Sequence, residues 1–335
     1  MTFIVCPNLA IDRVLAASAL RPGELTRCRA LVHQAGGKGA NVARALAALS
    51  GPAEDRRNLL LGLGAGHTGR LFAELADEED LAIELVVCDG EMRISTVILS
   101  DDGRVTPLFE RGPKITPADE RALLLALKSR PAAPGEWAVV DGAEPPGATP
   151  GFFADVCRML MAHGYRVLLD AAGDQLREGL RARPHLVKVN LDEAWSAFDG
   201  QRDCTPIGHA RPAAEVATEG RELSRRLVEA GAAEAIVTLG AAGAAGLLAD
   251  REWRVATPKV TARNTVGSGD CFAAALVLAF ENGSPPASAL AAAAGAGAAN
   301  AASQLTGHLD ADLARALAGA ATVSSCTRPG LADHS

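Results

Sequence analysis

The chain has 335 residues, of which 48% are hydrophobic and 22% are charged. This composition is typical of an ordinary folded protein with room for one large α/β domain or two smaller ones. The 33 basic and 40 acidic residues give a net charge of −7, which argues against nucleic acid as the main partner.

Neither the start of the chain nor its alanine-rich region predicts a membrane segment. The first six residues have no basic region and too short an apolar run for a signal peptide. Asn282–Pro286 interrupts the stretch 271–302, and its halves are too short to span a bilayer. We therefore expect no membrane partner and a cytoplasmic location.

The seven cysteines include no Cys-x-x-Cys pair, which favours reduced thiols, and we expect no metal site built by the protein alone.

Short apolar runs alternate with longer helical patterns along most of the chain. This alternation is typical of βαβ units and predicts a mainly parallel sheet with helices on both faces. Strands are predicted at residues 1–6, 58–63, 137–141, 165–170, 186–190 and 235–239, and helices at 40–50, 69–79, 117–128, 150–163, 220–230, 271–281, 287–303 and 310–320.

Several of these strands end in a polar residue or glycine. Asp141, Asp170, Asn190 and Gly240 all stand at or just after the end of an apolar run. In open α/β sheets, ligands bind beyond the carboxyl ends of the strands. We therefore expect a site along that edge of the sheet.

Two segments depart from this alternation and read as strands joined by turns at Arg21–Gly23 and Asp101–Gly103. They predict a small sheet that forms a lid over the site or a dimer surface. Polar residues 200–219 are expected to form a surface insertion. The expected organisation is an α/β core at 1–9, 36–90 and 112–322, a β lid at 10–35 and 91–111, and a flexible tail at 323–335.

The segment Asn264–Asp270 carries the first chemical signal. Gly267 and Gly269 allow a tight turn, and the apolar run after Asp270 predicts a helix whose free amides and positive dipole end attract phosphate oxygens. Asp270 lies in the same field, where a carboxylate is placed to accept a hydroxyl proton during phosphoryl transfer. On these residues alone, a plain turn capped by Asp270 is an equal alternative.

A second glycine-rich segment, Gly36–Asn41, marks another junction between a loop and a helix. Close backbone approach together with Lys38 suits a substrate that carries hydroxyls and an anion. Gly39 follows the lysine, so the segment is not a Walker loop, and a glycine turn with a solvated lysine is an equal alternative. Asp12, after the first strand, is placed to bind sugar hydroxyls. On this residue alone, an aspartate that caps a loop is the favoured interpretation.

A third segment supports a different class of function. Gly64–Gly69 matches Gly-x-Gly-x-x-Gly after the apolar run Leu59–Leu61, and Asp89 follows about twenty residues later, as in a dinucleotide fingerprint. This keeps an NAD-linked oxidoreductase as an alternative. The match begins long after the first predicted strand, and we favour a plain turn between a strand and a helix.

Five motifs occur in the order found in one enzyme family: Asn8-x-x-x-Asp12, Gly36-Gly-Lys-Gly-x-Asn-Val-Ala43, Lys188-x-Asn190-x-x-Glu193, Thr238-Leu-Gly240 and Thr265-Val-Gly-x-Gly-Asp270. Over about residues 1–320 the chain resembles the ribokinase-like (PfkB) carbohydrate kinases, most closely the branch of 1-phosphofructokinase and tagatose-6-phosphate kinase. The resemblance implies an α/β three-layer sandwich with a central, mostly parallel sheet and a small β-sheet lid that often forms a homodimer. It also implies transfer of the ATP γ-phosphate to a sugar hydroxyl with Mg²⁺.

The resemblance also implies roles for single residues around the sugar. Asp270 is expected to be the catalytic base. The amides that form the anion hole are those of Gly267, Ser268 and Gly269. The expected sugar ligands are Asp12, Gly37, Lys38 and Asn41. Arg93 matches the arginine that binds an existing phosphate on the sugar, and Arg27 in the lid is a weaker phosphate ligand that reaches a neighbouring subunit.

On the nucleotide side, the implied residues near the ATP phosphates and magnesium are Lys188, Asn190 and Glu193. Glu193 is expected to act on Mg²⁺ through water, with no direct protein ligand. Thr238 and Gly240 match the nucleotide-binding turn, and Asn300 matches the region beside the adenine. Without the resemblance, Asn190 and Glu193 read as helix-capping residues.

Three positions depart from the family pattern. Val189 replaces the proline of Lys-Pro-Asn, Ser268 replaces an alanine, and Asp141 replaces the first serine of Ser-Gly-Ser-Leu-Pro. The third bears on the substrate, because a carboxylate facing the sugar would repel a phosphate and accept hydrogen bonds from hydroxyls.

We therefore predict an ATP-dependent kinase of a ketohexose phosphate, such as fructose 1-phosphate or tagatose 6-phosphate. Asp141 keeps a kinase of an unphosphorylated sugar or polyol as the alternative within this class. The alternatives from other classes are the NAD-linked oxidoreductase and a sugar-sensing protein on a kinase scaffold. The intact glycine motifs count against the sensor, since a pure binder needs no base.

Overall fold

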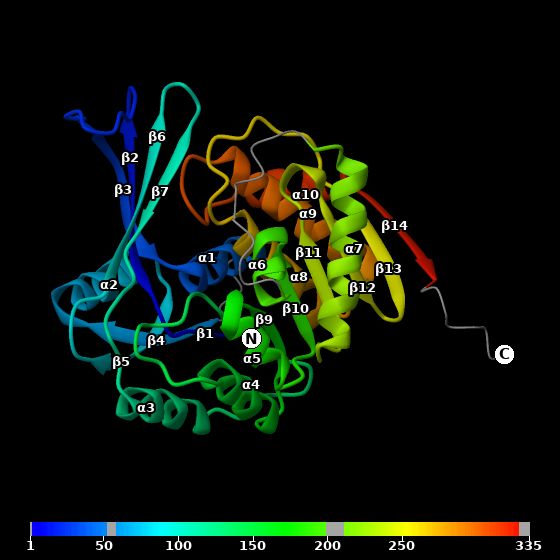
Figure 1. Cartoon of the computed structure of the whole chain (residues 1–335), viewed down its shortest axis with the longest axis horizontal. Helices are drawn as coiled ribbons and strands as arrows, with labels where there is room; N and C mark the ends of the chain where they lie inside the picture. Colours follow the sequence, from blue (N-terminus) through cyan, green and yellow to red (C-terminus); the bar gives the residue numbers. More distant parts are fainter. Residues whose placement is uncertain (1, 52–57, 199–210, 328–335) are drawn as a thin grey trace.

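The computed structural model describes residues 2–51, 58–198 and 211–327, and it contains a ten-stranded and a four-stranded sheet (Figure 1). From β11 to β5 the neighbouring strands of the large sheet run parallel, and β12, β13 and β14 extend it in antiparallel fashion. In spatial order its strands are β14 (Thr322–Thr327), β13 (Arg251–Ala256), β12 (Ala244–Leu248), β11 (Glu234–Thr238), β10 (Leu186–Asn190), β9 (Arg166–Asp170), β8 (Trp137–Asp141), β1 (Phe3–Cys6), β4 (Leu59–Ala65) and β5 (Ala82–Cys88).

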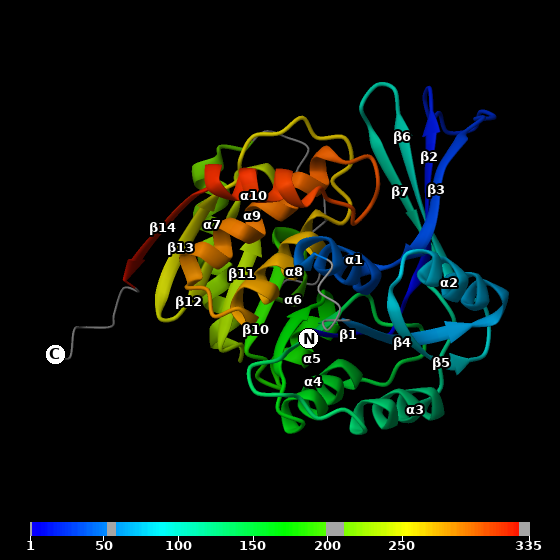
Figure 2. The same cartoon turned by 180° about the vertical axis from the view of Figure 1, so that it is seen from behind.

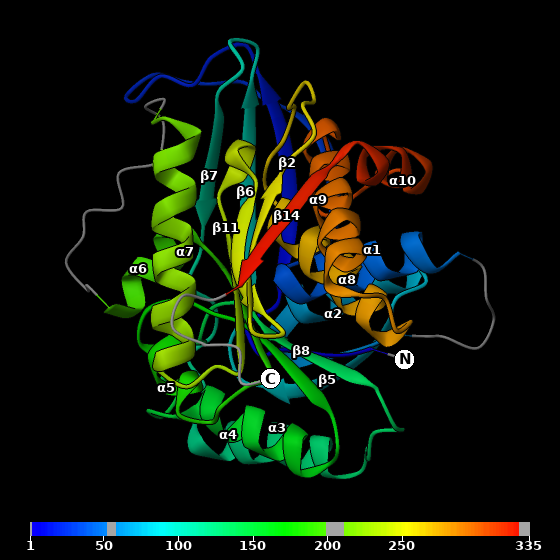
Figure 3. The ribbon, with the colours of Figure 1, turned by 90° about the vertical axis from the view of Figure 1, so that its right-hand side faces the viewer.

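The large sheet separates two hydrophobic cores. Because successive side chains of a strand point to opposite faces, Phe3 and Val5 of β1 join one core, and Ile4 and Cys6 join the other. One face is covered by α3 (Pro117–Lys128), α4 (Phe152–Ala162), α5 (Gly173–Leu180), α6 (Leu191–Phe198) and α7 (Ala213–Glu229). The other is covered by α1 (Lys38–Ser50), α2 (Gly66–Glu78), α8 (Ser268–Glu281) and α9 (Pro286–Ala302), with α10 (Ala311–Ala320) packed on α9 (Figures 2 and 3).

This arrangement confirms the predicted fold class, a three-layer sandwich with a mostly parallel sheet. Local sequence signals explain some of the boundaries. Helix α3 begins where predicted because Thr116 and Asp119 form a reciprocal capping box and Pro117 occupies the first turn. A short 3-10 turn, Gly240–Ala242, follows β11 at the edge where the site was expected.

The small sheet projects from the body of the molecule beside α1 and α2 (Figure 1). Its strands, in order, are β3 (Arg29–Gly36), β2 (Ala10–Ala17), β6 (Arg93–Ser100) and β7 (Val105–Phe109). The central pair β2 and β6 is parallel, with Ala10 opposite Arg93 and Asp12 opposite Ser95, whereas the two outer strands pair antiparallel. All four strands come from the two segments that the sequence predicted to form a lid.

The structure corrects two expectations about chain organisation. Residues 323–327, expected in a flexible tail, belong to β14, whose backbone pairs with β13 along its whole length. The remainder of that tail lies outside the described residues. Of the expected insertion at 200–219, residues 213–219 form the first turns of α7, and 199–210 also lie outside the described part.

The sequence analysis also missed several short elements, namely β5, α5, α6 and the hairpin of β12 and β13. Among the residues that the structure describes, no helix combines the length and the apolar character needed to cross a membrane.

Candidate active site

The glycine turn before α8 has the geometry expected of an anion cradle. Gly267 is the N-cap with φ of 86°, a left-handed conformation that favours glycine. A β-carbon there would also lie 2.6 Å from the amide nitrogen of Gly307. The amide of Ser268 donates to Thr265 within the turn at 3.3 Å, whereas among the described residues no acceptor takes the amide of Gly269. A free amide therefore remains at the positive end of the helix.

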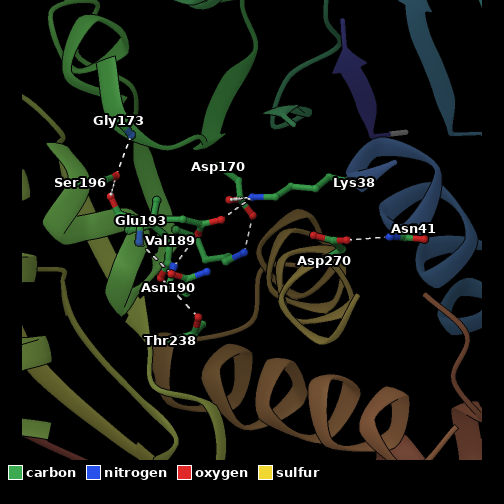
Figure 4. A network of polar contacts seen from close by, with 11 residues as sticks. Lys38, Asn41, Asp170, Gly173, Val189, Asn190, Glu193, Ser196, Thr238 and Asp270 are labelled. Carbon is green, nitrogen blue, oxygen red and sulfur yellow. Dashed lines mark hydrogen bonds and ion pairs between the residues drawn. The ribbon is translucent and has the colours of Figure 1, made fainter. Parts of the chain in front are cut away.

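Asp270 lies in the first turn of α8 and is almost fully buried. Its Oδ2 accepts a hydrogen bond of 2.8 Å from Asn41 Nδ2 on α1 (Figure 4). Burial raises the pKa of Asp270, and the nearby ammonium groups of Lys38 and Lys188 oppose this rise. Asn41, predicted to hold the sugar, therefore also holds the candidate base.

Two lysines and two carboxylates form a network beside Asp270 (Figure 4). Lys38 Nζ reaches across from α1 to Asp170 Oδ1 at 2.8 Å and to Glu193 Oε1 at 2.9 Å. Buried Lys188 Nζ pairs with the other oxygen of Asp170. Burial alone would raise the pKa of Asp170, but the two ammonium groups outweigh it and hold the pKa below its ordinary value.

Asp170 was not assigned a role in the sequence analysis, which noted it only as the last residue of a predicted strand. The signal that finds it is the combination of a strand-end carboxylate with a lysine at the same edge. Strand β9 ends at Asp170 and pairs with β10, which carries Lys188. Parallel neighbours end at the same edge of a sheet, so the two side chains meet there.

Asn190 and Glu193 cap the start of α6 reciprocally. The amide of Asn190 donates to Glu193 Oε2 and the amide of Glu193 donates to Asn190 Oδ1, both at 2.8 Å. The neighbouring strand contributes Thr238, whose hydroxyl donates to the carbonyl of Val189 at 3.3 Å. The capping interpretation of these residues is thus correct, and Glu193 serves the lysine network as well.

On the lid, Asp12 and Arg93 lie on adjacent strands. Asp12 is 6% exposed, and a β-carbon on Gly36 would come within 2.3 Å of its Cγ, so glycine at 36 makes room for this carboxyl. Burial raises the pKa of Asp12 to about 6, although the Arg44 guanidinium and the Gly37 amide act to lower it. Arg93 Nε and Nη2 donate to the carbonyl of Asn8 at 3.2 and 3.1 Å.

One cavity of about 720 Å³ brings most of the predicted residues together. It extends from the lid strands to the turn after β11 and includes the start of α8. The predicted residues that line it are Asp12, Gly37, Lys38, Asn41, Arg93, Lys188, Asn190, Glu193, Thr238, Gly240, Gly267, Ser268, Gly269 and Asp270.

Three predicted residues lie outside this lining. Arg27 is exposed in the connection between β2 and β3. Asn300 is fully buried on α9, where its Oδ1 accepts from Ser268 Oγ at 3.1 Å and its Nδ2 donates to the carbonyls of Leu305 and His308. These bonds tie the start of α8 to the loop that follows α9, and Asn300 does not line the cavity.

Asp141 is the third, and its position corrects the expectation that it faces the sugar. It is 1% exposed and lies beneath the start of α1, where its Oδ1 would be 3.3 Å from a β-carbon on Gly39. Among the described residues, neither carboxyl oxygen has an N–H or O–H donor in range, and the thiol of Cys6 is its polar neighbour. Burial, together with the charges of Asp270 and Asp170, raises the pKa of Asp141 well above its ordinary value, which disfavours the charged form that would repel a phosphate.

The Gly64–Gly69 segment is filled by a carboxylate of the chain itself. Glu91 accepts from the amides of His67 and Thr68 at 3.1 and 2.9 Å and from the Thr68 hydroxyl at 2.8 Å. A β-carbon on Gly66 would overlap this carboxylate. The start of α2 is therefore capped, and its glycines lie outside the cavity lining, which does not support a dinucleotide site.

The sequence of the chain matches one family model over most of its length. Residues 1–312 match the pfkB family carbohydrate kinases. The chain belongs to this family. It is therefore an ATP-dependent sugar kinase, and its expected motifs fall on the cavity just described.

Named relatives and solved structures agree with this membership. The chain is 29% identical over 291 residues to a 1-phosphofructokinase of Haloferax volcanii, covering 87% of each protein. It is also 29% identical over 276 residues to a 1-phosphofructokinase of Escherichia coli K12, covering 81% of each. The crystal structure of Escherichia coli phosphofructokinase-2 with potassium has the same fold, with a TM-score of 0.82 at 23% identity, covering 95% of this chain and 98% of that one.

Proposed function

We propose that this kinase transfers the γ-phosphate of ATP to a hydroxyl of a ketohexose phosphate, fructose 1-phosphate or tagatose 6-phosphate, with Asp270 as the general base. The observation that carries the proposal is that Arg93, Asp270 and Thr238 line the same cavity. One cavity thus offers a cation for a sugar phosphate, a carboxylate beside an anion cradle, and the turn expected to bind the nucleotide. The two 1-phosphofructokinase relatives support the same substrate class.

The order of the strands supports separate sides for the two substrates. Strands β10 and β11, which carry Asn190 and Thr238, lie on one side of β9, and β1, which leads into the lid, lies on the other. Arg93 supports a phosphate site on the lid side. Its guanidinium has five N–H groups, of which three donate hydrogen bonds within the protein and two remain available. Among the described residues no carboxylate forms an ion pair with it, so its charge is available to an anion.

In the proposed reaction, Asp270 accepts the proton of the sugar hydroxyl while the hydroxyl oxygen forms its bond to the γ-phosphorus. The bond between that phosphorus and its bridging oxygen breaks, and ADP leaves. The amide of Gly269 and the positive end of α8 stabilise the charge on the transferring group. Asn41 keeps the carboxylate of Asp270 oriented.

The residues present fit a magnesium ion that arrives with ATP. Asp170 and Glu193 offer the oxygen ligands that Mg²⁺ prefers, and this ion usually keeps several waters. Within the described residues no group of three or more acidic, histidine or cysteine side chains is suited to hold a metal alone. When bound, the ion would supply charge neutralisation on the phosphates, while Lys38 and Lys188 orient the two carboxylates.

The observation behind the free-sugar alternative no longer favours it, because Asp141 is buried away from the cavity lining. The homodimer through the lid stays a prediction, which the exposed side chains of Leu25, Leu108 and Phe109 in the lid support.

The test is ADP release from Mg-ATP with fructose 1-phosphate, fructose 6-phosphate, tagatose 6-phosphate and the unphosphorylated sugars, for the wild type and for Asp270→Asn. We expect turnover of one phosphosugar and a loss of about 10²–10⁴ in kcat for the variant, the range of general-base catalysis. Asp155→Asn, on the exposed surface of α4, is the matched control and should keep its kcat. Near-normal kcat in Asp270→Asn would refute the assignment of the base, and turnover of free sugars alone would refute the substrate class.

A further inference from the structure

Arg44 is a buried guanidinium that lines no part of the cavity yet lies one contact away from the proposed base. It stands one helical turn after Asn41 on α1, and its side chain is 8% exposed. Its Nε donates to Glu79 at the end of α2 at 2.5 Å, and Nη2 donates to the carbonyl of Ala35 at 2.5 Å. Nη1 donates to Asn41 Oδ1 at 3.1 Å.

The contact between Arg44 and Asn41 fixes which end of the amide meets Asp270. A guanidinium has donors and no acceptor, so it can bond only to the oxygen of the Asn41 amide. The amide nitrogen must then point the other way, toward Asp270 Oδ2 at 2.8 Å. A donor in this position stabilises the charged form of Asp270, which is the form that accepts a proton.

We propose that Arg44 is a positioning residue that locks the Asn41 amide as a hydrogen-bond donor to Asp270 and thereby keeps the base ionised. This inference rests on the proposed role of Asp270. It assigns no contact between Arg44 and either substrate. Glu79 holds the guanidinium from the far side and also accepts from the amide of Ala35 at 3.0 Å, so Arg44 has one fixed position.

The packing around Asn41 leaves little other room for the amide. A β-carbon on Gly307 would lie 2.4 Å from Asn41 Oδ1, so glycine at 307 makes space for this side chain. Gly307 in turn contacts Gly267 of the cradle, where a β-carbon would lie 2.6 Å from its amide nitrogen. The amide that orients the base is therefore packed against the loop that supports the anion cradle.

Other charged groups also act on Asp270, and a test has to separate them from Arg44. Lys38 from α1 and Lys188 from β10 favour its ionised form, and Asp170 from β9 opposes it. Asp12 on β2 and Asp141 on β8 also lie within electrostatic range. The positive charge of Arg44 itself acts on Asp12.

Arg44→Lys is the variant that isolates the positioning role, because it keeps the positive charge near Asp12. A lysine ammonium pairs with Glu79 but lacks the planar fork that reaches Asn41 at the same time. We expect the acid limb of kcat against pH to move up by about one unit, since losing a hydrogen bond to a charged group alters its proton affinity on the order of tenfold. On the acid side of this limb, where Asp270 is mostly protonated, we expect kcat to fall roughly tenfold. Arg225→Lys, an arginine paired with Glu252 on the far side of the large sheet, is the matched control and should leave the profile unchanged.

A second pair of variants separates positioning from general loosening of the structure. Asn41→Ala removes the donor itself and should move the acid limb in the same direction. If Arg44 acts through Asn41, adding Arg44→Lys to Asn41→Ala moves the limb no further. An equal further shift in the double variant would overturn the inference. So would a drop in melting temperature or kcat for Arg44→Lys with an unmoved acid limb. Asp270→Asn tests the base separately, so an inactive Asp270→Asn beside an unaffected Arg44→Lys rejects only the inference about Arg44.

Discussion

The buried carboxyl of Asp12 makes the stability of this protein depend on pH in a way that one substitution removes. Asp12→Asn replaces the carboxyl by a neutral group of nearly the same shape. In the native protein, burial raises the pKa of Asp12 from 3.8 to about 6, against the opposing effects of Arg44 and Gly37. In the unfolded chain the same group titrates near its ordinary value.

The sign of the effect follows from this raised pKa. The folded protein binds the Asp12 proton more tightly than the unfolded chain, so this contribution to stability is complete below pH 3.8 and is lost as the pH rises through about 6. A difference of about two pKa units corresponds to about 3 kcal/mol in the free energy of unfolding. About 2 kcal/mol of that loss falls between pH 4.5 and 8.

Urea unfolding of the wild type and Asp12→Asn at pH 4.5, 5.5, 6.5 and 8 measures this directly. We expect the variant to gain stability relative to the wild type by about 2 kcal/mol across this range, with most of the change below pH 6.5. Asp89→Asn, at an exposed position, serves as the matched control and should show a flat difference. A pH-independent difference for Asp12→Asn would refute the reasoning, because it would mean that folding leaves the proton affinity of Asp12 unchanged.

Two further predictions concern the substrate. Arg93→Met should raise the KM for the phosphosugar by about 10- to 100-fold, because it removes a charge-assisted hydrogen bond, and should leave the KM for ATP unchanged. Steady-state kinetics with each substrate varied in turn measures both constants. An equal rise in both KM values would contradict the prediction. Asp141→Asn should keep the ratio of kcat/KM for the phosphosugar over the free sugar, because Asp141 is buried and outside the cavity lining. A tenfold change in that ratio would show that Asp141 acts on the sugar after all.

The sequence predicted the architecture well because its strongest signals are local. Apolar runs such as 137–141 and 186–190 and helices such as 117–128 have the same bounds in the structure. The hairpin of β12 and β13 was missed because it belongs to the antiparallel extension of the sheet, where no helix follows a strand. Strand β14 was missed because Thr322–Thr327 has little apolar pattern and forms a strand by pairing with the free edge of β13.

The site was predicted in composition and less well in its internal contacts. Motif spacing identified fourteen of the residues that line the cavity. It could not show that Asn41 donates a hydrogen bond to Asp270, or that Asn300 forms hydrogen bonds with Ser268 and the loop after α9. Asn41 and Asp270 are separated by 229 residues in the sequence, and Ser268 and Asn300 by 32, so no local pattern links them. Asp141 was misread because its effect depends on which way a strand-end side chain points, which only the packing of β8 against β1 decides.

The register of the small sheet fixes how two predicted sugar ligands lie relative to each other. Asp12 and Arg93 are carried by β2 and β6, which stay in parallel register from Ala10 opposite Arg93 to Ala17 opposite Ser100. Backbone hydrogen bonds between these strands therefore set the spacing between the backbone positions of Asp12 and Arg93. In the proposed function, where both residues bind the sugar, this fixed spacing favours acceptors of one length over those that are one carbon longer or shorter.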